Sequence, residues 1–84
     1  MYKAIVNVTL RKSILDPQGK ATYQALHNLG LNGIREVRIG KRIELQIDAE
    51  NEEKAREIAE IACTRLLVNE VMEDYTVEIE APVS

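Results

Sequence analysis

The chain has 84 residues, 30% of them charged, and acidic side chains outnumber basic ones to give a net charge of −3. This length predicts one domain, residues 1–84, and the net charge argues against a nucleic-acid partner, which would favour a basic face. No apolar run approaches the roughly 20 residues that cross a membrane, and the start does not read as a signal peptide, so no membrane partner is expected. Cys63 is the only cysteine, which excludes an internal disulfide and favours the cytoplasm.

Residues 2–10 alternate between apolar and polar side chains, which is typical of a β-strand with one buried face. The apolar side of this predicted strand holds Tyr2, Ala4, Val6, Val8 and Leu10. Lys3, Asn7 and Thr9 fall on the other side.

The first helix is predicted over residues 18–29, with apolar residues at helical spacing. Asp16 is a good N-cap, and Pro17 suits the first helical position. Gly19 inside the first turn costs up to about 1 kcal/mol relative to Ala, so we expect its backbone to approach another segment or molecule closely. His27 has no second His near it and no acid four residues away, which predicts a surface or hydrogen-bonded residue, not a ligand.

Residues 34–39 and 42–47 also alternate, which predicts two more strands. Gly40 and Lys41 lie between them, and Gly at the first central position suits a two-residue hairpin loop. One long bent strand with a bulge at Gly40 is the alternative.

The second helix is predicted to begin after Asn51, which is an N-cap followed by acidic residues, and to end near Asn69. Its expected core stripe is Ala55, Ile58, Ala59, Ala62 and Leu66. Cys63 lies among these apolar residues and is expected to be a buried small side chain. Residues 72–80 alternate again and predict the last strand, with Tyr75, Val77 and Ile79 facing inward.

The resulting order, β-α-β-β-α-β, predicts an α+β fold of the ferredoxin-like class, a two-layer sandwich with an antiparallel sheet and both helices on one face. The opposite face is expected to be polar. It would carry Asn7, Thr9, Arg38, Glu44, Gln46, Thr76 and Glu78.

No arrangement of residues in the sequence predicts chemistry on this chain. One His and one Cys on different helices do not form a metal cluster or a nucleophile-base pair, and no phosphate-binding Gly-rich loop is present. We therefore expect no catalytic residue, no metal site and no cofactor, and a binding or structural role. One candidate is a dimeric regulatory module that binds an amino acid or nucleotide at the loop after the first strand.

Three segments together resemble the PurS family, the small subunit of phosphoribosylformylglycinamidine (FGAM) synthase, over essentially the whole chain. They are Leu15-Asp16-Pro17-Gln18-Gly19, then Val37-Arg38-Ile39-Gly40-Lys41, then Leu66-Leu67 with Asn69 and Glu73-Asp74-Tyr75. The resemblance implies a non-catalytic subunit in purine biosynthesis. It would bridge a glutaminase subunit (PurQ) and a synthetase subunit (PurL), assist ammonia transfer between them, and associate with itself as a dimer or tetramer.

The same resemblance implies that ATP and Mg²⁺ are used by the synthetase partner, with glutamine as the nitrogen donor. The resemblance also implies that residues in these segments contact other subunits. These are Asp16, Pro17, Gln18, Gly19, Arg38, Gly40, Lys41, Asn69, Glu73, Asp74 and Tyr75.

Overall fold

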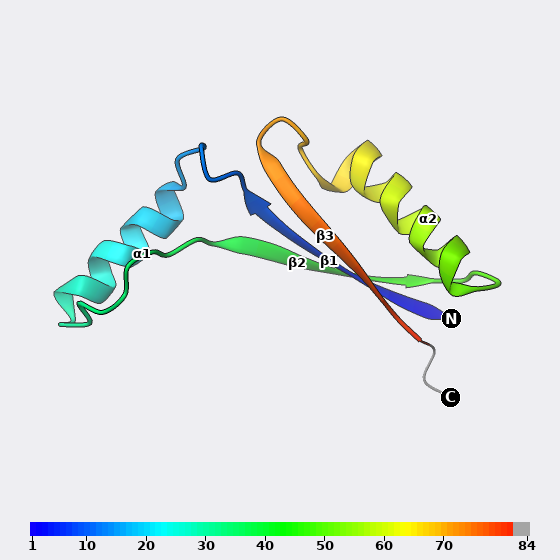
Figure 1. The fold of residues 1–84 in the computed structure, drawn as a ribbon, viewed down its shortest axis with the longest axis horizontal. Helices are drawn as coiled ribbons and strands as arrows, with labels where there is room; N and C mark the ends of the chain where they lie inside the picture. The colour runs from blue at the N-terminus through cyan, green and yellow to red at the C-terminus, as the bar shows by residue number, and fades with distance from the viewer. Residues whose placement is uncertain (82–84) are drawn as a thin grey trace.

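The computed structural model describes residues 1–81, which form three strands and two helices (Figure 1). In chain order the elements are β1 (Tyr2–Leu10), α1 (Pro17–Asn28), β2 (Gly40–Ile47), α2 (Glu52–Ala62), the π-helical turn η1 (Cys63–Leu67) and β3 (Glu73–Glu80). Both helices begin at the predicted caps, because Asp16 accepts from the Gly19 amide and Asn51 from the Lys54 amide. Gly30, just beyond α1, has a φ of +87°, as expected for a helix C-terminus.

The sheet is antiparallel, with β1 in the centre and the order β2-β1-β3. Tyr2 pairs with Ile47 at one end of the β1–β2 ladder and Thr9 with Gly40 at the other. On the opposite edge, Leu10 pairs with Glu73. Both ladders therefore place the alternate residues of the three strands on the same two faces, as the alternation predicts.

One face of the sheet carries the core, and α2 covers it. Ala4, Ala55 and Ala59 are fully buried at one end of this contact, and Ile47 beside them is 7% exposed. At the other end Cys63 is fully buried against Val6 and Val8. The small side chains of α2 let the helix lie close to the central strand. Cys63, at the start of η1, is buried there, which confirms its predicted role as a buried small side chain.

The second helix of the fold lies elsewhere. Within residues 1–81, α1 packs against none of the three strands. It extends from one end of the sheet as an arm, which we define as residues 11–39, and the segment after the helix returns along it to β2 (Figure 1). His27 fixes this return through its Nε2 atom, 2.8 Å from the carbonyl oxygen of Ile34, so the predicted hydrogen-bonded role of His27 is confirmed.

The ferredoxin-like α+β class holds, but three details of the prediction were wrong. Residues 34–39 form no strand, so the described sheet has three strands and not four. No hairpin lies at Gly40-Lys41, because Gly40 is the first residue of β2 and pairs with Thr9. Within residues 1–81 only α2 packs on the sheet, and Arg38, expected on the open sheet face, belongs to the arm.

The predicted core stripe of α2 was also partly wrong. Ala55 and Ala59 are buried, but Ile58 is 45% exposed and Leu66 is 84% exposed. A π-helical turn has more residues per turn than an α-helix, so successive side chains in η1 rotate less about the helix axis. Each side chain therefore points in a different direction from the one that a regular α-helix would give it. Leu66 therefore points out of the core, and Leu67 and Val68 pack there in its place.

Candidate functional site: the junction between the sheet and the arm

Asp16 organises the place where the arm leaves the sheet. One oxygen of its carboxylate accepts from the Gly19 amide at 3.0 Å and caps α1. The other accepts from the Ile39 amide at 2.9 Å, one residue before β2. These two backbone donors, and then the positive charge of Arg38, hold the pKa of the Asp16 carboxyl below its ordinary value. Asp16 is therefore a carboxylate at neutral pH and ties the start of the helix to the start of β2.

Two glycines make the junction possible. A Cβ atom on Gly19 would lie 2.5 Å from the carbonyl oxygen of Val37 and 2.6 Å from the Asp16 carboxylate. A Cβ on Gly40 would lie 2.3 Å from the carbonyl oxygen of Val8. The close approach expected at Gly19 is present, but the segment that approaches it belongs to the same chain.

Arg38 closes the junction from the other side. Its guanidinium donates to the carbonyl oxygens of Leu10 and Arg11, the second at 2.9 Å. Only 25% of the Arg38 side chain is exposed. Arg38 thus holds the last residue of β1 and the first residue of the arm to the segment that leads into β2.

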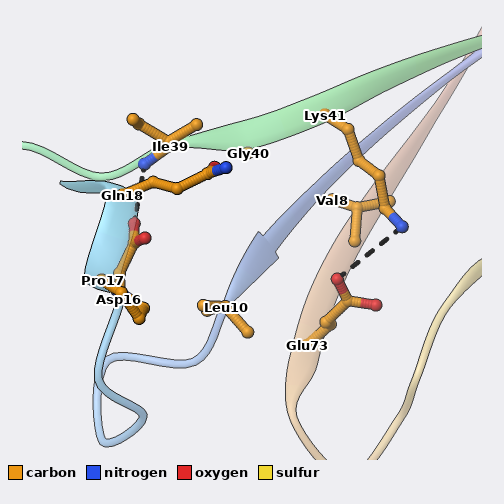
Figure 2. A pocket seen from close by; sticks show the side chains of 9 residues that line it. All are labelled: Val8, Leu10, Asp16, Pro17, Gln18, Ile39, Gly40, Lys41 and Glu73. Carbon is orange, nitrogen blue, oxygen red and sulfur yellow. Dashed lines mark hydrogen bonds and ion pairs between the residues drawn. The ribbon is translucent and has the colours of Figure 1, made fainter.

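A hollow of about 320 Å³ opens between the base of the arm and the end of the sheet (Figure 2). Val8, Leu10 and Ile39 give it apolar walls. Its polar lining comes from Asp16, Gln18, Lys41 and Glu73, with Pro17 and Gly40 between them. Lys41 and Glu73 face each other from the two edge strands, with Nζ and Oε2 3.9 Å apart.

The turn between η1 and β3 forms the adjoining part of this surface. Asn69 donates its amide to Glu73 Oε1 at 2.9 Å, and its side-chain oxygen accepts from the Val71 amide at 3.1 Å. Arg11 reaches this turn from the arm, with its Nε 3.4 Å from Asp74 Oδ1, and donates to the carbonyl oxygen of Glu70. Glu73 therefore belongs to both places, since it lines the hollow and also closes the turn.

Tyr75 connects β3 to α2. Its hydroxyl donates to Glu60 Oε2 at 2.7 Å. This hydrogen bond to a carboxylate, followed by burial, raises the pKa of Tyr75 to about 12. Burial, with the nearby charge of Glu60, also raises the pKa of the Cys63 thiol, so the thiol stays protonated and unreactive at neutral pH.

The structure brings most of the predicted contact residues together at the junction. Asp16, Pro17, Gln18, Gly40, Lys41 and Glu73 line the hollow. Gly19 and Arg38 line a second hollow that shares Asp16 with the first, Asn69 lies in the neighbouring turn, and Asp74 lies in β3 beside that turn. Tyr75 is separate, because its hydroxyl is directed to α2. Arg11 and the apolar walls were missed, since in the sequence they read only as the end of a strand.

The junction offers a shaped and charged surface. Among residues 1–81, no three His, Cys, Asp or Glu side chains are placed to hold a metal ion. The same residues contain no helix with the length and apolar character needed to cross a membrane. An open hollow with apolar walls, a Lys and carboxylates suits recognition of another surface.

Comparison with known proteins identifies the family. The family model described as PurS, phosphoribosylformylglycinamidine (FGAM) synthase, matches residues 3–81. The chain belongs to the PurS family. The PurS subunit of Bacillus subtilis is 44% identical to this PurS chain over 84 residues, covering 100% of this chain and 99% of the relative. The PurS subunit of Methanocaldococcus jannaschii is 42% identical over 80 residues, 95% of this chain and 96% of the relative.

Solved structures agree with the fold of this PurS chain. The crystal structure of Methanocaldococcus jannaschii PurS, one of the subunits of formylglycinamide ribonucleotide amidotransferase in the purine biosynthetic pathway, matches with a TM-score of 0.88 and 42% identity. That match covers 99% of this chain and 100% of the other. A chain of the PurLQS structure from Thermotoga maritima matches with a TM-score of 0.87 and 38% identity, over 94% of this chain and 96% of the other. The relatives thus carry the PurS fold at nearly full length.

Proposed function

We propose that this chain is the non-catalytic subunit that joins a PurL-type synthetase to a PurQ-type glutaminase in an FGAM synthase of purine biosynthesis. The observation that carries the proposal is the nearly full-length match to a chain of the PurLQS structure from Thermotoga maritima. In this role the chain assists the transfer of ammonia from the glutaminase to the synthetase, residues 1–84 act as one domain, and the chain also associates with itself. The site of action is the cytoplasm.

The physical reason for such a subunit is the chemistry of ammonia. Free ammonia in water at neutral pH is mostly ammonium, which is not a nucleophile, and it diffuses away. A subunit that docks two active sites against each other excludes water and raises the local concentration of ammonia. ATP and Mg²⁺ act on the synthetase, where the amide oxygen of formylglycinamide ribonucleotide is activated, so this chain needs contact surfaces and no catalytic group.

We place the contact to a partner subunit at the junction. Gln18, Lys41 and Asp74 are exposed there, with 57% of the Lys41 side chain and 68% of the Asp74 side chain accessible. Pro17 and Glu73 complete this outward surface beside the apolar walls of the hollow. Asp16, Gly19, Arg38, Gly40, Asn69 and Tyr75 support it from within through the contacts described above.

The test is reconstitution with a PurL-type and a PurQ-type subunit. ATP-dependent synthesis is measured with glutamine and, separately, with ammonium as the nitrogen donor. We expect glutamine-driven synthesis to require this chain and ammonium-driven synthesis to proceed without it. If neither rate responds and no complex forms on a sizing column with substrates present, the regulatory-module alternative replaces the proposal, and stabilisation by an amino acid or nucleotide then tests it.

A further inference from the structure

The charge of the chain is divided unevenly between the arm and the rest of the molecule. The arm, residues 11–39, holds five of the 11 basic residues and two of the 14 acidic ones, which gives it a formal charge of +3. The remainder of the chain carries −6. Because the arm stands out from one end of the sheet (Figure 1), its positive charge is displaced from the acidic body of the molecule. A positive end on an acidic protein attracts anions to that end.

The arm contains the second hollow, of about 510 Å³, which we call the arm hollow. Three segments surround it, namely the loop at residues 12–15, the first two turns of α1, and the returning segment at residues 35–38. Each segment contributes a basic side chain, and these are Lys12, Lys20 and Arg35 in that order. The volume is typical of sites that hold small ligands. One ligand in the arm hollow can therefore meet cations from three sides.

These three cations have no anionic partner in the described part of the chain. Lys12, Lys20 and Arg35 are exposed, and none of them forms an ion pair within residues 1–81. The basic residues that do form ion pairs are Lys3, Arg11, Arg38, Lys41, Arg42 and Lys54. Like charges repel one another, so three unpaired cations around one hollow point to an anion that binds between them.

The acidic residues of the arm hollow do not cancel this charge. Both carboxylate oxygens of Asp16 already accept from backbone amides. Glu36 places its Oε1 atom 3.8 Å from Nη1 of Arg38, and the charge of Arg38 also acts on Asp16. Arg38 itself is held by backbone carbonyl oxygens and is only 25% exposed. The two carboxylates are thus partnered by fixed groups, and the three unpaired cations remain available to a ligand.

We propose that the arm hollow binds a ligand that carries a di- or triphosphate group, with Lys12, Lys20 and Arg35 as its phosphate contacts. Several negative charges close together match three cations better than one carboxylate does, and Arg and Lys are the side chains that bind phosphate. The proposal goes beyond the proposed function and does not rest on it.

Tyr23 distinguishes two sources of the phosphate group. Its side chain lines the arm hollow and is half-buried, and its ring centroid lies 4.2 Å from that of His27. A nucleoside diphosphate can place its base beside this aromatic ring, because every base has a face that stacks on aromatic side chains. Free pyrophosphate would use the cations alone. Comparing the two ligands therefore identifies the source.

Calorimetric titration of the full chain with pyrophosphate tests the site. We expect binding that weakens as the salt concentration rises. Lys20→Gln and Arg35→Gln should each raise the Kd about five- to tenfold, the effect of losing one exposed charge-assisted contact. Arg65→Gln is the matched control, because Arg65 is also exposed and unpaired within residues 1–81 but lies in η1, outside the arm hollow. Its Kd should equal that of the wild type.

Titration with ADP and with adenosine completes the test. Tighter binding of ADP than of pyrophosphate assigns the site to nucleotides, and equal binding assigns it to the phosphates alone. Adenosine that binds as tightly as ADP overturns the proposal, because the cations would then contribute nothing. The backbone amide signals of residues 12–20 and 35–38 should shift in NMR spectra on addition of pyrophosphate, and shifts confined to other residues would also overturn it.

Two further results would remove the proposal. One is the absence of binding at millimolar pyrophosphate, and the other is an equal rise in Kd for Arg35→Gln and Arg65→Gln. If the wild type binds no pyrophosphate but Arg35→Gln lowers glutamine-driven synthesis in the reconstituted complex, the arm hollow receives an acidic surface of a partner subunit instead. The proposed function would stand in that case, and only the phosphate site would fall.

Discussion

Asp16 shows how one side chain can set the direction of a whole segment. Its two oxygens satisfy amides at the start of α1 and just before β2, positions 20 or more residues apart, so the carboxylate acts as a helix cap and as a link across the junction. Gly19 and Gly40 allow the backbones to come close enough for this link. In the sequence Asp16 predicts only the cap, because the second amide belongs to a segment whose position depends on the tertiary structure.

The first prediction concerns the charge of Asp16. Its pKa is lower in the folded chain than its ordinary value of 3.8, so the carboxylate stabilises the fold above that pH, and the stabilisation is lost as the pH falls through the folded pKa. Asp16→Asn should lower the melting temperature at pH 7 and reduce the difference from wild type at pH 3. Thermal unfolding followed by circular dichroism at both pH values measures this. A constant difference between the two proteins across this range would contradict the assignment.

A second prediction concerns Gly40. A methyl group there meets the Val8 carbonyl oxygen inside the β1–β2 ladder, where neither backbone can move freely. Gly40→Ala should therefore lower the free energy of unfolding by about 1–3 kcal/mol, the usual cost of overpacking. Gly33→Ala is the matched control, because a Cβ at Gly33 has no neighbour within 4 Å. Urea unfolding of the two variants decides the point, and equal stabilities would show that the ladder adjusts around Gly40.

Among the elements, alternation and helix caps predicted β1, α1, α2 and β3 well, since each pattern is local and the caps are present. The same alternation in residues 34–39 predicted a strand that does not form. That segment follows α1 outside the sheet, where Ile34 and Val37 are half-buried next to the helix and not within a strand. The prediction that Leu66 lies in the core was wrong for a related reason. Periodicity assumes a regular α-helix, and η1 departs from that geometry.

The link between α2 and β3 gives a prediction at this scale. Tyr75 has a pKa of about 12 against an ordinary 10, so its contribution is complete below pH 10 and is lost as the pH rises towards 12. Tyr75→Phe should cost about 1.5–3 kcal/mol at pH 7, the range for a hydrogen bond to a charged group. It should also make unfolding less sensitive to pH between 10 and 12. Chemical denaturation across that range measures this pH dependence. Tyr2→Phe is the control, and its unfolding should depend on alkaline pH as in the wild type.

At the scale of the whole molecule, the small size of the chain and its protruding arm both limit the hydrophobic core of a single copy. A domain of this length buries only about 60% of its unfolded surface or slightly more. In the described part of this chain, α2 is the one long helix that covers the core face of the sheet. The arm adds exposed apolar area, with Leu15 and Leu29 each at least 70% exposed. A single copy therefore has a modest core, and contacts with other chains are expected to supply part of the stability.

This dependence leads to the last prediction, which concerns protein concentration. If folding is coupled to association, the melting temperature rises with concentration, because mass action favours the assembled folded state. We expect the wild-type melting temperature to increase over a hundredfold range of concentration. Leu29→Asp should melt lower and show no such increase, because it places a charge on the arm surface, whereas Asn28→Asp should behave as wild type. A melting temperature that is the same at all concentrations for the wild type would mean that one copy folds to its full stability alone, with the arm unsupported.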